Sequence, residues 1–418
     1  MSKDIISDTF LPIHIIKNKA EPWQTKHELN PHYTYEINED NLVFGNLLGQ
    51  GSFCDVHEVA VEYLNDDQSQ DMNPRFPYAV KRLCPQNKTD PERLKVGVTD
   101  LVRECKILAR LSHENIISLY GATGECLSDV ITPSASGNYS LVLERLESTL
   151  EKQIPIWRDR EKLIRDEDDE RLIPFNRQTT FPRRKDVALQ IARALVHIHK
   201  IGIMYRDLKP ENIGFDSQGV VKVFDFGLAK SIVLSKNGEK ERSHTAMTGS
   251  LRYMAPEVAF GQNYGPKADV YSFGILLWQL FFLQTPFSQY DESITFIQGV
   301  FIQGERPFIY KNISAAIQRL MICCWSSKEK IRPTFLHIVR MFEKGVNHIP
   351  RWDIFRHGVK PKKKCHLKKL HQTDSDVTHA STVSKTESEL DSSSHDFIIK
   401  DSHFCGISSV LNMMHPCS

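Results

Sequence analysis

The sequence predicts an α+β fold with two lobes, in which a small antiparallel sheet with one main helix precedes a larger, mostly helical lobe. Short β-rich segments dominate residues 42–143, and a single helical pattern interrupts them. From Asp186 onward, apolar residues recur at helical spacing instead. The run Gly274–Leu283 is apolar on every side, which is typical of a helix buried in a large core.

The first lobe is expected to be a sheet because its apolar segments are short and rich in Val, Ile, Leu and Tyr. The expected strands are Leu42–Leu48, Val56–Tyr63, Tyr78–Leu83, Ile117–Gly121 and Tyr139–Leu143. One helix, Leu101–Leu111, is expected between the third and fourth strands. A small antiparallel sheet with a single helix fits that order.

The second lobe is expected to be helical because Val187, Ile191, Leu195 and Ile198 have the spacing of one buried helix face. Further helices are expected over Lys267–Phe282, around Ile313–Cys324 and over Phe335–Phe342. Between the lobes, Glu147–Lys185 is dense in alternating charge. This composition indicates a solvated insertion, over about residues 151–185.

These patterns divide the chain into three parts. The expected bounds are 1–41 for an N-terminal extension, 42–346 for the two-lobed domain and 347–418 for a C-terminal tail. Within the domain, the sheet lobe spans 42–143, a connecting hinge 144–147 and the helical lobe 148–346. The tail is rich in Ser and Thr, which is typical of a mobile segment. Its lysine cluster, Lys360–Lys369, is either a nuclear address, a contact for an acidic partner or simply a solvated run.

The composition is that of an ordinary soluble protein. The chain has 418 residues, of which 40% are hydrophobic and 25% charged, and its net charge is +1. Such a charge gives no general attraction to nucleic acid or membrane, so neither partner is expected. The nine cysteines form no C-x-x-C pair, which favours reduced thiols. The N-terminus lacks a signal-peptide core, and we expect a cytoplasmic protein, with the nucleus as an alternative.

The most informative segment is Tyr205-Arg206-Asp207-Leu208-Lys209-Pro210-Glu211-Asn212, which Asp225-Phe226-Gly227 follows after the length of one strand. The first segment places an aspartate, a lysine and an asparagine on one short loop. The second places another aspartate where a strand should end. Such a loop can hold a divalent metal, polarise a hydroxyl group and neutralise phosphate charge, which are the needs of phosphoryl transfer.

These two segments resemble the catalytic motifs of the eukaryotic protein kinase family. The resemblance implies a bilobal protein-kinase-like fold, ATP as phosphate donor, and Mg²⁺ as cofactor, with Mn²⁺ as an alternative. In that family, Asp207 would accept or orient the proton of the substrate hydroxyl, and Lys209 would contact the γ-phosphate. Asn212 and Asp225 would supply oxygen ligands to the metal.

The segment from Leu48 to Val56 resembles the glycine-rich loop of the family, which covers the nucleotide phosphates. The resemblance implies nucleotide contacts from Leu48, Gly49, Gln50, Gly51, Ser52, Phe53 and Val56, with Phe53 shielding the phosphates from water. Cys54 stands where the pattern has its third glycine, so the loop should be somewhat stiffer. A lone G-x-G is weak evidence, because a tight hairpin has the same sequence.

The segment Tyr78-Ala79-Val80-Lys81 predicts a buried strand that ends its apolar run with a lysine. An inward-facing lysine is costly unless it is paired. The resemblance implies that Lys81 contacts the nucleotide phosphates and pairs with Glu104 on the helix, while Ala79 lines the nucleotide site. The alternative is that Lys81 and Glu104 are two separate surface charges.

The hinge and the pocket floor follow from the same resemblance. Leu143 would guard the back of the nucleotide pocket, and backbone groups near Glu144 and Leu146 would bond the adenine. Gly214 stands where the family usually places a bulky residue under the adenine, so we expect a thin floor. Tyr205 replaces the usual histidine, and we expect its ring to pack under Phe226.

The segment before Gly249 has the position of the family's activation segment. Arg206 and Lys230 would meet a phosphate there, and the candidate phosphorylation sites are Ser243, Thr245 and Thr248. The alternative is a solvated loop whose hydroxyl groups have no such role.

Three further residues would be structural. Glu257 would pair with Arg332, and Asp269 would tie the backbone of the catalytic loop to the core helix. Ser250 would bond toward Asp207 and Lys209. The combination of Lys209 with Ser250 favours Ser/Thr over Tyr as the acceptor, and residues 249–254 look most like the tyrosine-kinase-like branch of the Ser/Thr kinases.

Two hypotheses of function follow. The first is an active Ser/Thr protein kinase of intracellular signalling, acting on protein substrates under an activator that the sequence does not name. The second is a pseudokinase, a nucleotide-sensing or scaffolding module of the same shape. Lys81, Asp207, Asn212 and Asp225 are all present, which favours the first.

Overall fold

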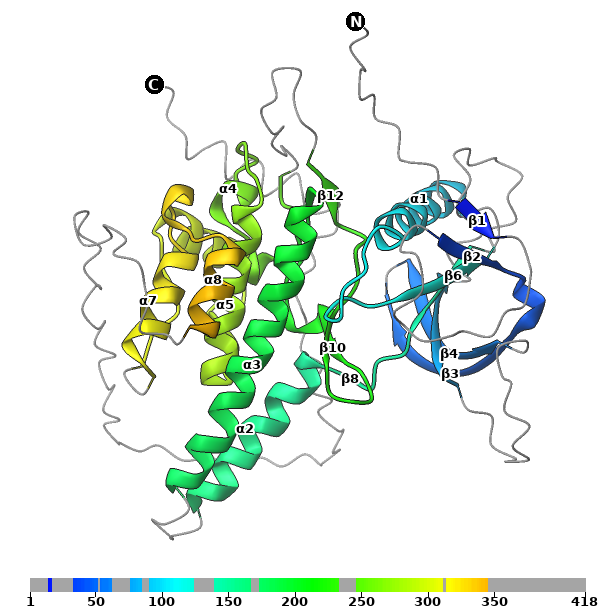
Figure 1. Ribbon diagram of the computed structural model, residues 1–418. Coiled ribbons are helices and arrows are strands. Elements are labelled where there is room, and N and C mark those ends of the chain that lie inside the picture. Colours follow the sequence, from blue (N-terminus) through cyan, green and yellow to red (C-terminus); the bar gives the residue numbers. More distant parts are fainter. Residues whose placement is uncertain are drawn as a thin grey trace, which may run out of the picture.

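The computed structural model describes residues 14–16, 33–51, 53–61, 76–84, 90–123, 139–166, 173–232, 246–310 and 313–344. Within them the chain forms two lobes, a sheet with one long helix and a larger bundle of helices (Figure 1). The expected α+β, two-lobed architecture is therefore confirmed.

The sheet of the first lobe has an antiparallel core, as expected. Its five antiparallel strands are β3 (Leu42–Gln50), β4 (Cys54–Val61), β5 (Tyr78–Leu83), β7 (Ser140–Glu144) and β6 (Leu119–Thr123), in that spatial order. The strand β5 has the predicted bounds, whereas β6 lies two residues later and β4 begins two residues earlier than predicted. The Cα partners Val56 and Lys81 place these two side chains on the same face of the sheet.

Two further strands extend this sheet at its β6 edge. The strand β2 (Tyr33–Ile37) pairs with β6 in parallel, and β1 (His14–Ile16) pairs with β2 in parallel. The sequence gives little sign of them, because residues before Asn41 are weakly patterned. Ile37 is nonetheless buried together with Val59 and Val80. Part of the expected N-terminal extension therefore belongs to the sheet of the first lobe.

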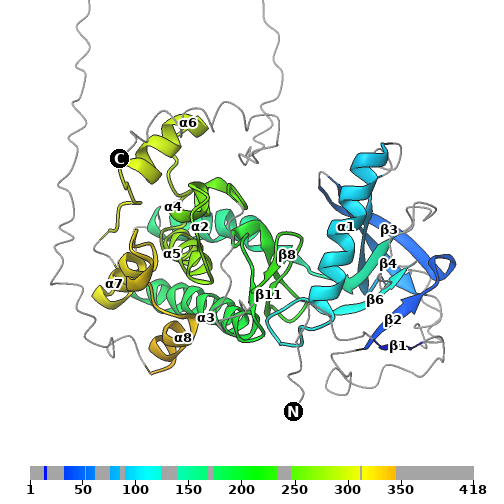
Figure 2. The same ribbon diagram turned by 90° about the horizontal axis from the view of Figure 1, so that it is seen from above.

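The helix of the first lobe, α1 (Pro91–Leu108), lies beside the sheet (Figure 2). Its N-cap is Asp90, whose Oδ1 accepts from the backbone N–H groups of Glu92 at 3.0 Å and Arg93 at 3.3 Å. The predicted start at Leu101 was therefore ten residues late. The Asp-Pro pair at 90–91 was the signal of the true start, since Pro is favoured at the first helical position.

The second lobe consists of helices with short strands at its junction with the first lobe. The α-helices are α2 (Leu150–Asp166), α3 (Ile173–Lys200), α4 (Pro256–Ala259), α5 (Lys267–Phe282), α6 (Ser293–Phe296), α7 (Ala315–Cys324) and α8 (Phe335–Glu343). The short strands are β8 (Ser148–Thr149), β9 (Ile203–Met204), β10 (Ile213–Phe215), β11 (Val221–Val223) and β12 (Lys230–Ser231). Segments of 3-10 helix span Glu39–Asn41, Pro210–Asn212, Leu251–Tyr253 and Glu329–Ile331, and a π-helical segment spans Ile297–Ile302.

The core of this lobe is built around α5, which has the predicted bounds and is buried along most of its length. It packs between α3 and α7, and α3 packs in turn against α8. The short strands β10 and β11 form a hairpin that carries the segments before and after them, Asn212 and Asp225, to the junction of the lobes.

The charged stretch at about residues 151–185 was expected to be a solvated insertion, and its described parts, 151–166 and 173–185, are helical. Residues 150–166 form α2 and residues 173–185 are the first half of α3, which lies alongside it (Figure 1). Leu150, Ile154 and Trp157 are buried because they recur at i, i+4 and i+7 on one helix face. The alternating charges on the other faces concealed this stripe.

Several expected features lie outside the described residues: the tail 347–418 with Lys360–Lys369, and the single positions Ser52, Tyr63, Ser243 and Thr245. Among the residues that are described, no helix has both the length and the hydropathy to cross a bilayer.

Candidate active site

The junction of the two lobes brings Lys81 of β5, Glu104 of α1 and Asp225 together. Lys81 Nζ lies 2.7 Å from Glu104 Oε2 and 2.9 Å from Asp225 Oδ1. Glu104 is buried, with 2% of its surface exposed, so its charge is out of water and needs this partner. The expected pairing of Lys81 with Glu104 is present, and these residues are not two separate surface charges.

The charges of this cluster support one another. Burial alone would lower the pKa of Lys81, but the carboxylates of Asp225 and Glu104 hold it above its usual value. Lys81 in turn lowers the pKa of Asp225, against the effect of burial, and Lys209 lowers it further. Burial raises the pKa of Glu104. Lys81 is therefore a cation and Asp225 an anion at neutral pH, and the Asp225 side chain keeps 42% of its surface exposed.

Glu104 also holds the Asp225-Phe226-Gly227 segment. Its second oxygen, Oε1, accepts from the backbone N–H of Phe226 at 3.1 Å. The Phe226 ring is buried and meets the ring of Tyr205 edge-on, with centroids 5.2 Å apart and planes at 74°. Tyr205 therefore has the expected packing position. Its hydroxyl group also donates a hydrogen bond to the carbonyl of Phe224. A histidine at this position has no hydroxyl group and could donate only from a ring nitrogen.

The catalytic loop gathers a second cluster around Asp207, which is 8% exposed. Asp207 Oδ1 accepts from Ser250 twice, from its backbone N–H at 3.0 Å and from its hydroxyl group at 2.9 Å. Asp207 Oδ2 accepts from Asn212 Nδ2 at 2.9 Å and lies 3.4 Å from Lys209 Nζ. Ser250, Asn212 and Lys209, which the sequence assigned to this loop and to phosphoryl transfer, thus each contact Asp207.

The catalytic loop is anchored to α5 by Asp269, which is 1% exposed. Its carboxylate accepts from the backbone N–H groups of Tyr205 at 3.0 Å and Arg206 at 2.7 Å, and it lies 2.7 Å from His199 Nε2. The backbone tie predicted for Asp269 is therefore present. His199 is a partner that the sequence analysis missed.

Two residues of the site have left-handed backbones, Arg206 with φ 73° and Asp225 with φ 60°. Such conformations are uncommon for residues with side chains and cost of order 1–3 kcal/mol each. They turn the chain sharply before Asp207 and at Asp225. No pattern in the sequence marks them, because neither residue is glycine or asparagine.

The predicted pair of Glu257 and Arg332 forms a two-pronged ion pair, at 2.5 Å and 2.9 Å. Arg332 is fully buried and also donates to the carbonyls of Ser326 at 2.8 Å and Lys267 at 3.0 Å. This arrangement fixes the segment after Ser250 to the core around α5.

The glycine-rich loop is the turn between β3 and β4. Its turn closes through the Gly51 N–H, which donates to the Cys54 carbonyl at 2.8 Å, while Leu48, Gly49, Gln50 and Gly51 are exposed and Val56 is half-buried. Phe53 does not stand at the open tip: an ideal Cβ on Gly97 of α1 would lie 3.7 Å from its ring, so Phe53 packs against α1. The shielding of the phosphates by Phe53 stays a prediction.

The segment that connects the two lobes contains Leu143, Glu144 and Leu146. Leu143 is buried opposite Ala79 on the paired strand. Glu144 contacts both lobes: Oε1 lies 3.0 Å from Lys222 Nζ, and Oε2 accepts from the backbone N–H of Ser118 at 3.2 Å. The floor at Gly214 is not thin, which corrects the expectation, because the side chains of Leu146 and Phe224 fill the space beside it.

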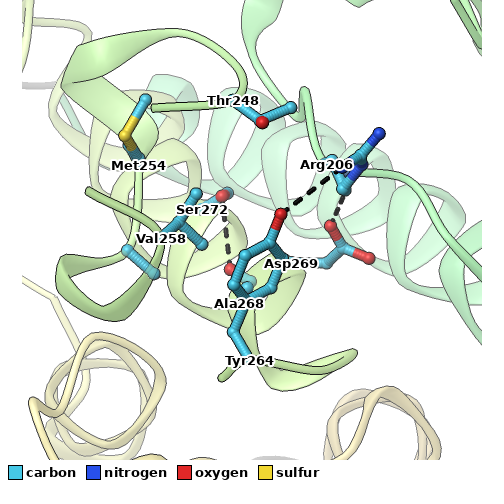
Figure 3. Close-up of a pocket in the computed structure, with 9 residues that line it drawn as sticks. Arg206, Thr248, Met254, Val258, Tyr264, Ala268, Asp269 and Ser272 are labelled. Atoms are coloured by element: carbon cyan, nitrogen blue, oxygen red, sulfur yellow. Dashed lines mark hydrogen bonds between the residues drawn. The ribbon is translucent and has the colours of Figure 1, made fainter. Parts of the chain in front are cut away.

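Arg206 lines a small pocket with Thr248, Tyr264 and Asp269 behind the activation segment (Figure 3). Its guanidinium group donates from Nε to the Leu228 carbonyl at 2.6 Å and from Nη1 to the Tyr264 hydroxyl at 3.4 Å. Thr248 is the one phosphorylation candidate within the described residues, since Ser243 and Thr245 lie outside them. Lys230 is exposed on β12, two residues beyond Leu228.

The residues present fit a divalent cation that is held mainly by phosphate and water. No group of three His, Cys, Asp or Glu side chains suited to a metal occurs in the described part of the chain. Asn212 donates to Asp207 through Nδ2, so Oδ1 is the atom it can offer to a cation, and Asp225 adds an exposed carboxylate. Two oxygen donors are the usual protein share for Mg²⁺, which keeps its remaining positions for substrate phosphate and water.

Comparison with known proteins agrees with this geometry. A family model described as the protein kinase domain matches residues 42–342. The chain is 29% identical over 314 residues to the serine/threonine-protein kinase STY46 of Arabidopsis thaliana, covering 74% of this chain and 45% of that protein. It is 30% identical over 309 residues to the dual specificity protein kinase shkA of Dictyostelium discoideum, covering 74% and 50%. It is 30% identical over 254 residues to mitogen-activated protein kinase kinase kinase 7 of Homo sapiens, covering 60% and 36%.

The chain thus spans half the length of these relatives, or less. The family match itself covers well over half of this chain and includes both clusters of the site. Members of this family use ATP and a divalent metal. The chain belongs to the protein kinase domain family.

Proposed function

We propose that the protein is an ATP- and Mg²⁺-dependent protein kinase that phosphorylates Ser and Thr hydroxyl groups of other proteins. The observation that carries this proposal is the pair of assembled clusters, Lys81–Glu104–Asp225 and Asp207–Asn212–Lys209. A pseudokinase that only binds partners does not require either of these clusters. Their joint presence favours the enzyme over the pseudokinase.

Each side chain has a separate task in this reaction. Lys81 supplies a fixed positive charge for the phosphates, and Glu104 keeps it in place. Asp207 orients the substrate hydroxyl group and takes its proton, while Lys209, 3.4 Å away, offsets the charge that shifts during transfer. Asn212 and Asp225 would hold the Mg²⁺ ion, which supplies charge neutralisation to the phosphates when it is bound.

The preference for Ser and Thr is supported by the contacts of Asp207. Lys209 and Ser250 lie on either oxygen of this carboxylate, so an acceptor hydroxyl group must approach closely between them. The names of the relatives point to the same class, although shkA is described as having dual specificity. Phosphorylation of Tyr is therefore the second candidate, to be separated by experiment.

We further propose that a phosphate on the activation segment stabilises the active loop through Arg206. The guanidinium group is a permanent cation that lines the same pocket as Thr248. It donates hydrogen bonds to two neutral acceptors, the Leu228 carbonyl and the Tyr264 hydroxyl group. A phosphate would make charge-assisted bonds in their place. Mass spectrometry of the active protein should find phosphate on Ser243, Thr245 or Thr248, and an active preparation unmodified at all three would contradict the idea.

The function is tested by incubating the purified chain with γ-labelled ATP, Mg²⁺ and a mixed protein substrate, followed by phosphoamino acid analysis. The wild type should transfer label to Ser and Thr, and Asp207→Asn and Asp225→Asn should each lower the rate by at least about a hundredfold. Leu336→Ala, on the exposed face of α8, serves as a control that leaves the rate unchanged. Equal labelling by wild type and both variants would contradict the proposal, and label on Tyr would favour dual specificity.

A further inference from the structure

Glu58 of β4 is a buried carboxylate that stands opposite an irregularity in the neighbouring strand β3. Between two regular pairs of the ladder, Gly45 and Asn46 of β3 face the single residue Glu58. Such a β-bulge interrupts the hydrogen bonds between the strands. Glu58 supplies an acceptor there, because its Oε2 accepts from the backbone N–H of Asn46 at 3.3 Å and from Asn46 Nδ2 at 3.1 Å. An ideal Cβ on Gly45 would lie 2.9 Å from Glu58 Cβ, so glycine leaves the room that this side chain needs.

The other oxygen of Glu58 binds the hinge. Arg145, the first residue after β7, places Nη2 3.0 Å from Glu58 Oε1 and donates from Nη1 to the Phe76 carbonyl at 3.0 Å. Glu58 is 8% exposed, so its charge is largely out of water, and the donors around it offset the cost of burial. One carboxylate therefore joins the hinge to the bulge of β3.

This link lies between the glycine-rich loop and the connection to the second lobe. The strand β3 is at the edge of the sheet, pairs with β4 and leads from the bulge into the glycine-rich loop. Glu144, directly before Arg145, lies 3.0 Å from Lys222 of the second lobe. Adjacent hinge residues therefore hold the second lobe on one side and the strand that carries the glycine-rich loop on the other.

We propose that Glu58 and Arg145 are positioning residues for the nucleotide, because they hold the glycine-rich loop at a fixed distance from the hinge. This inference rests on the proposed function, and both residues act through the loop rather than on the reacting atoms. Without the link, the end of β3 keeps only an interrupted ladder, since a second register shift lies between Leu47 and Gly49. The loop would then spend less time in the conformation that binds phosphate, which lowers the apparent affinity for ATP by the same fraction.

The test is the rate of phosphate transfer by the full chain, measured at varied ATP and a fixed amount of mixed protein substrate. Glu58→Gln and Arg145→Met should each raise the KM for ATP about fivefold and keep kcat within about twofold of the wild type, because only binding is lost. The combined variant should raise KM no further than the larger single effect, because both changes break one link. Arg158→Met is the matched control: Arg158 of α2 is also beside a carboxylate, 3.9 Å from Asp159 Oδ1, and its loss should leave KM and kcat unchanged.

Thermal unfolding without nucleotide checks that each variant is folded. Asn46→Ala, at an exposed position, weakens the same link at β3 and should raise KM about twofold, so it decides the question if the other single variants do not fold. A wild-type KM in the folded variants, a fall in kcat beyond about twofold, or effects that add in the combined variant would overturn this inference and leave the kinase proposal intact. A wild type that transfers no phosphate from ATP would overturn the proposed function itself.

Discussion

The contact between Asp207 and Ser250 depends on one residue, Gly249, whose backbone conformation few other residues tolerate. Gly249, next to Ser250, has φ 96°, and a Cβ there would overlap the carbonyl oxygen of Arg206. Glycine at this position lets the activation segment approach the catalytic loop closely enough for Ser250 to bond Asp207.

We therefore expect Gly249→Ala to lower the free energy of unfolding by about 2–3 kcal/mol and to reduce the transfer rate strongly. Chemical denaturation and a phosphotransfer assay measure the two effects. Gly219→Ala is a matched control, since Gly219 also has a positive φ of 77° but has no atom within 4 Å of an added Cβ. It should lose about 1 kcal/mol of stability and no activity. Equal effects of the two substitutions would show that close approach is not the reason for Gly249.

Cys54, at the third position of the glycine-rich pattern, is expected to be an unreactive thiol. Burial raises its pKa to about 12, against the lowering effect of Lys81. Because the thiolate is the reactive form, a raised pKa leaves less of it at any given pH. At pH 8, alkylation of Cys54 by iodoacetamide should be about a thousandfold slower than that of a free thiol, and the rate should rise about tenfold per pH unit. Peptide mass spectrometry measures this, and modification as fast as a model thiol would contradict it.

The residue contacts show which parts of the site a sequence can reveal. Lys81, Glu104, Asp207, Asn212 and Asp225 were predictable, because their types and order are constrained by charge and by metal binding. The bond of Glu104 to the Phe226 N–H and the left-handed backbones at Arg206 and Asp225 were not. They arise from tertiary contacts, which leave no local pattern.

Helices and strands were predicted best where the apolar residues form one continuous run, as in α5 and β5. The errors have two causes. The start of α1 was placed late because its first turns are polar, although Asp90 and Pro91 marked a cap. The helices α2 and α3 were missed over residues 151–185 because charged residues outnumber the narrow stripe of Leu150, Ile154 and Trp157.

The docking of α2 and α3 onto the core gives a test at this scale. Arg184 is 4% exposed, donates from Nη1 to the Phe281 carbonyl of α5 at 2.9 Å and forms an ion pair with Glu161 of α2. Arg184→Leu should lower the free energy of unfolding by about 2 kcal/mol, because it leaves a buried carbonyl and a carboxylate without their donor. Arg160→Leu, at an exposed position of α2, should change it by less than about 0.5 kcal/mol. If the two variants unfold alike in urea, the charged stretch does not dock as the structure shows.

The whole molecule depends on contacts that cross from one lobe to the other. One is at the hinge, where Lys222 of β11 is 2% exposed and lies 3.0 Å from Glu144 and 3.6 Å from Asp216. The other is at the catalytic end, where Glu104 of the first lobe binds Phe226 of the second. Together they join the two lobes at the hinge and beside the catalytic loop.

Lys222→Met keeps the length of the side chain and removes the cation that lies 3.0 Å from the buried Glu144 carboxylate. We expect a loss of about 3 kcal/mol in the free energy of unfolding. The double variant Lys222→Met/Glu144→Met should recover part of this loss, because it removes the Glu144 carboxylate as well, while Asp216 keeps the backbone donors Gln218 and Val220. Thermal and urea unfolding measure both variants. A single variant as stable as the wild type would contradict the role of this ion pair.

The central claim is that the two lobes bring Lys81, Asn212 and Asp225 to one nucleotide and its metal ion. Calorimetric titration of a non-hydrolysable ATP analogue into the full chain, with and without Mg²⁺, tests it most directly. Mg²⁺ should strengthen binding to the wild type by about tenfold or more and should have little effect on Asp225→Asn. Equal affinity of the wild type with and without Mg²⁺, or the same Mg²⁺ effect in Asp225→Asn, would contradict the account.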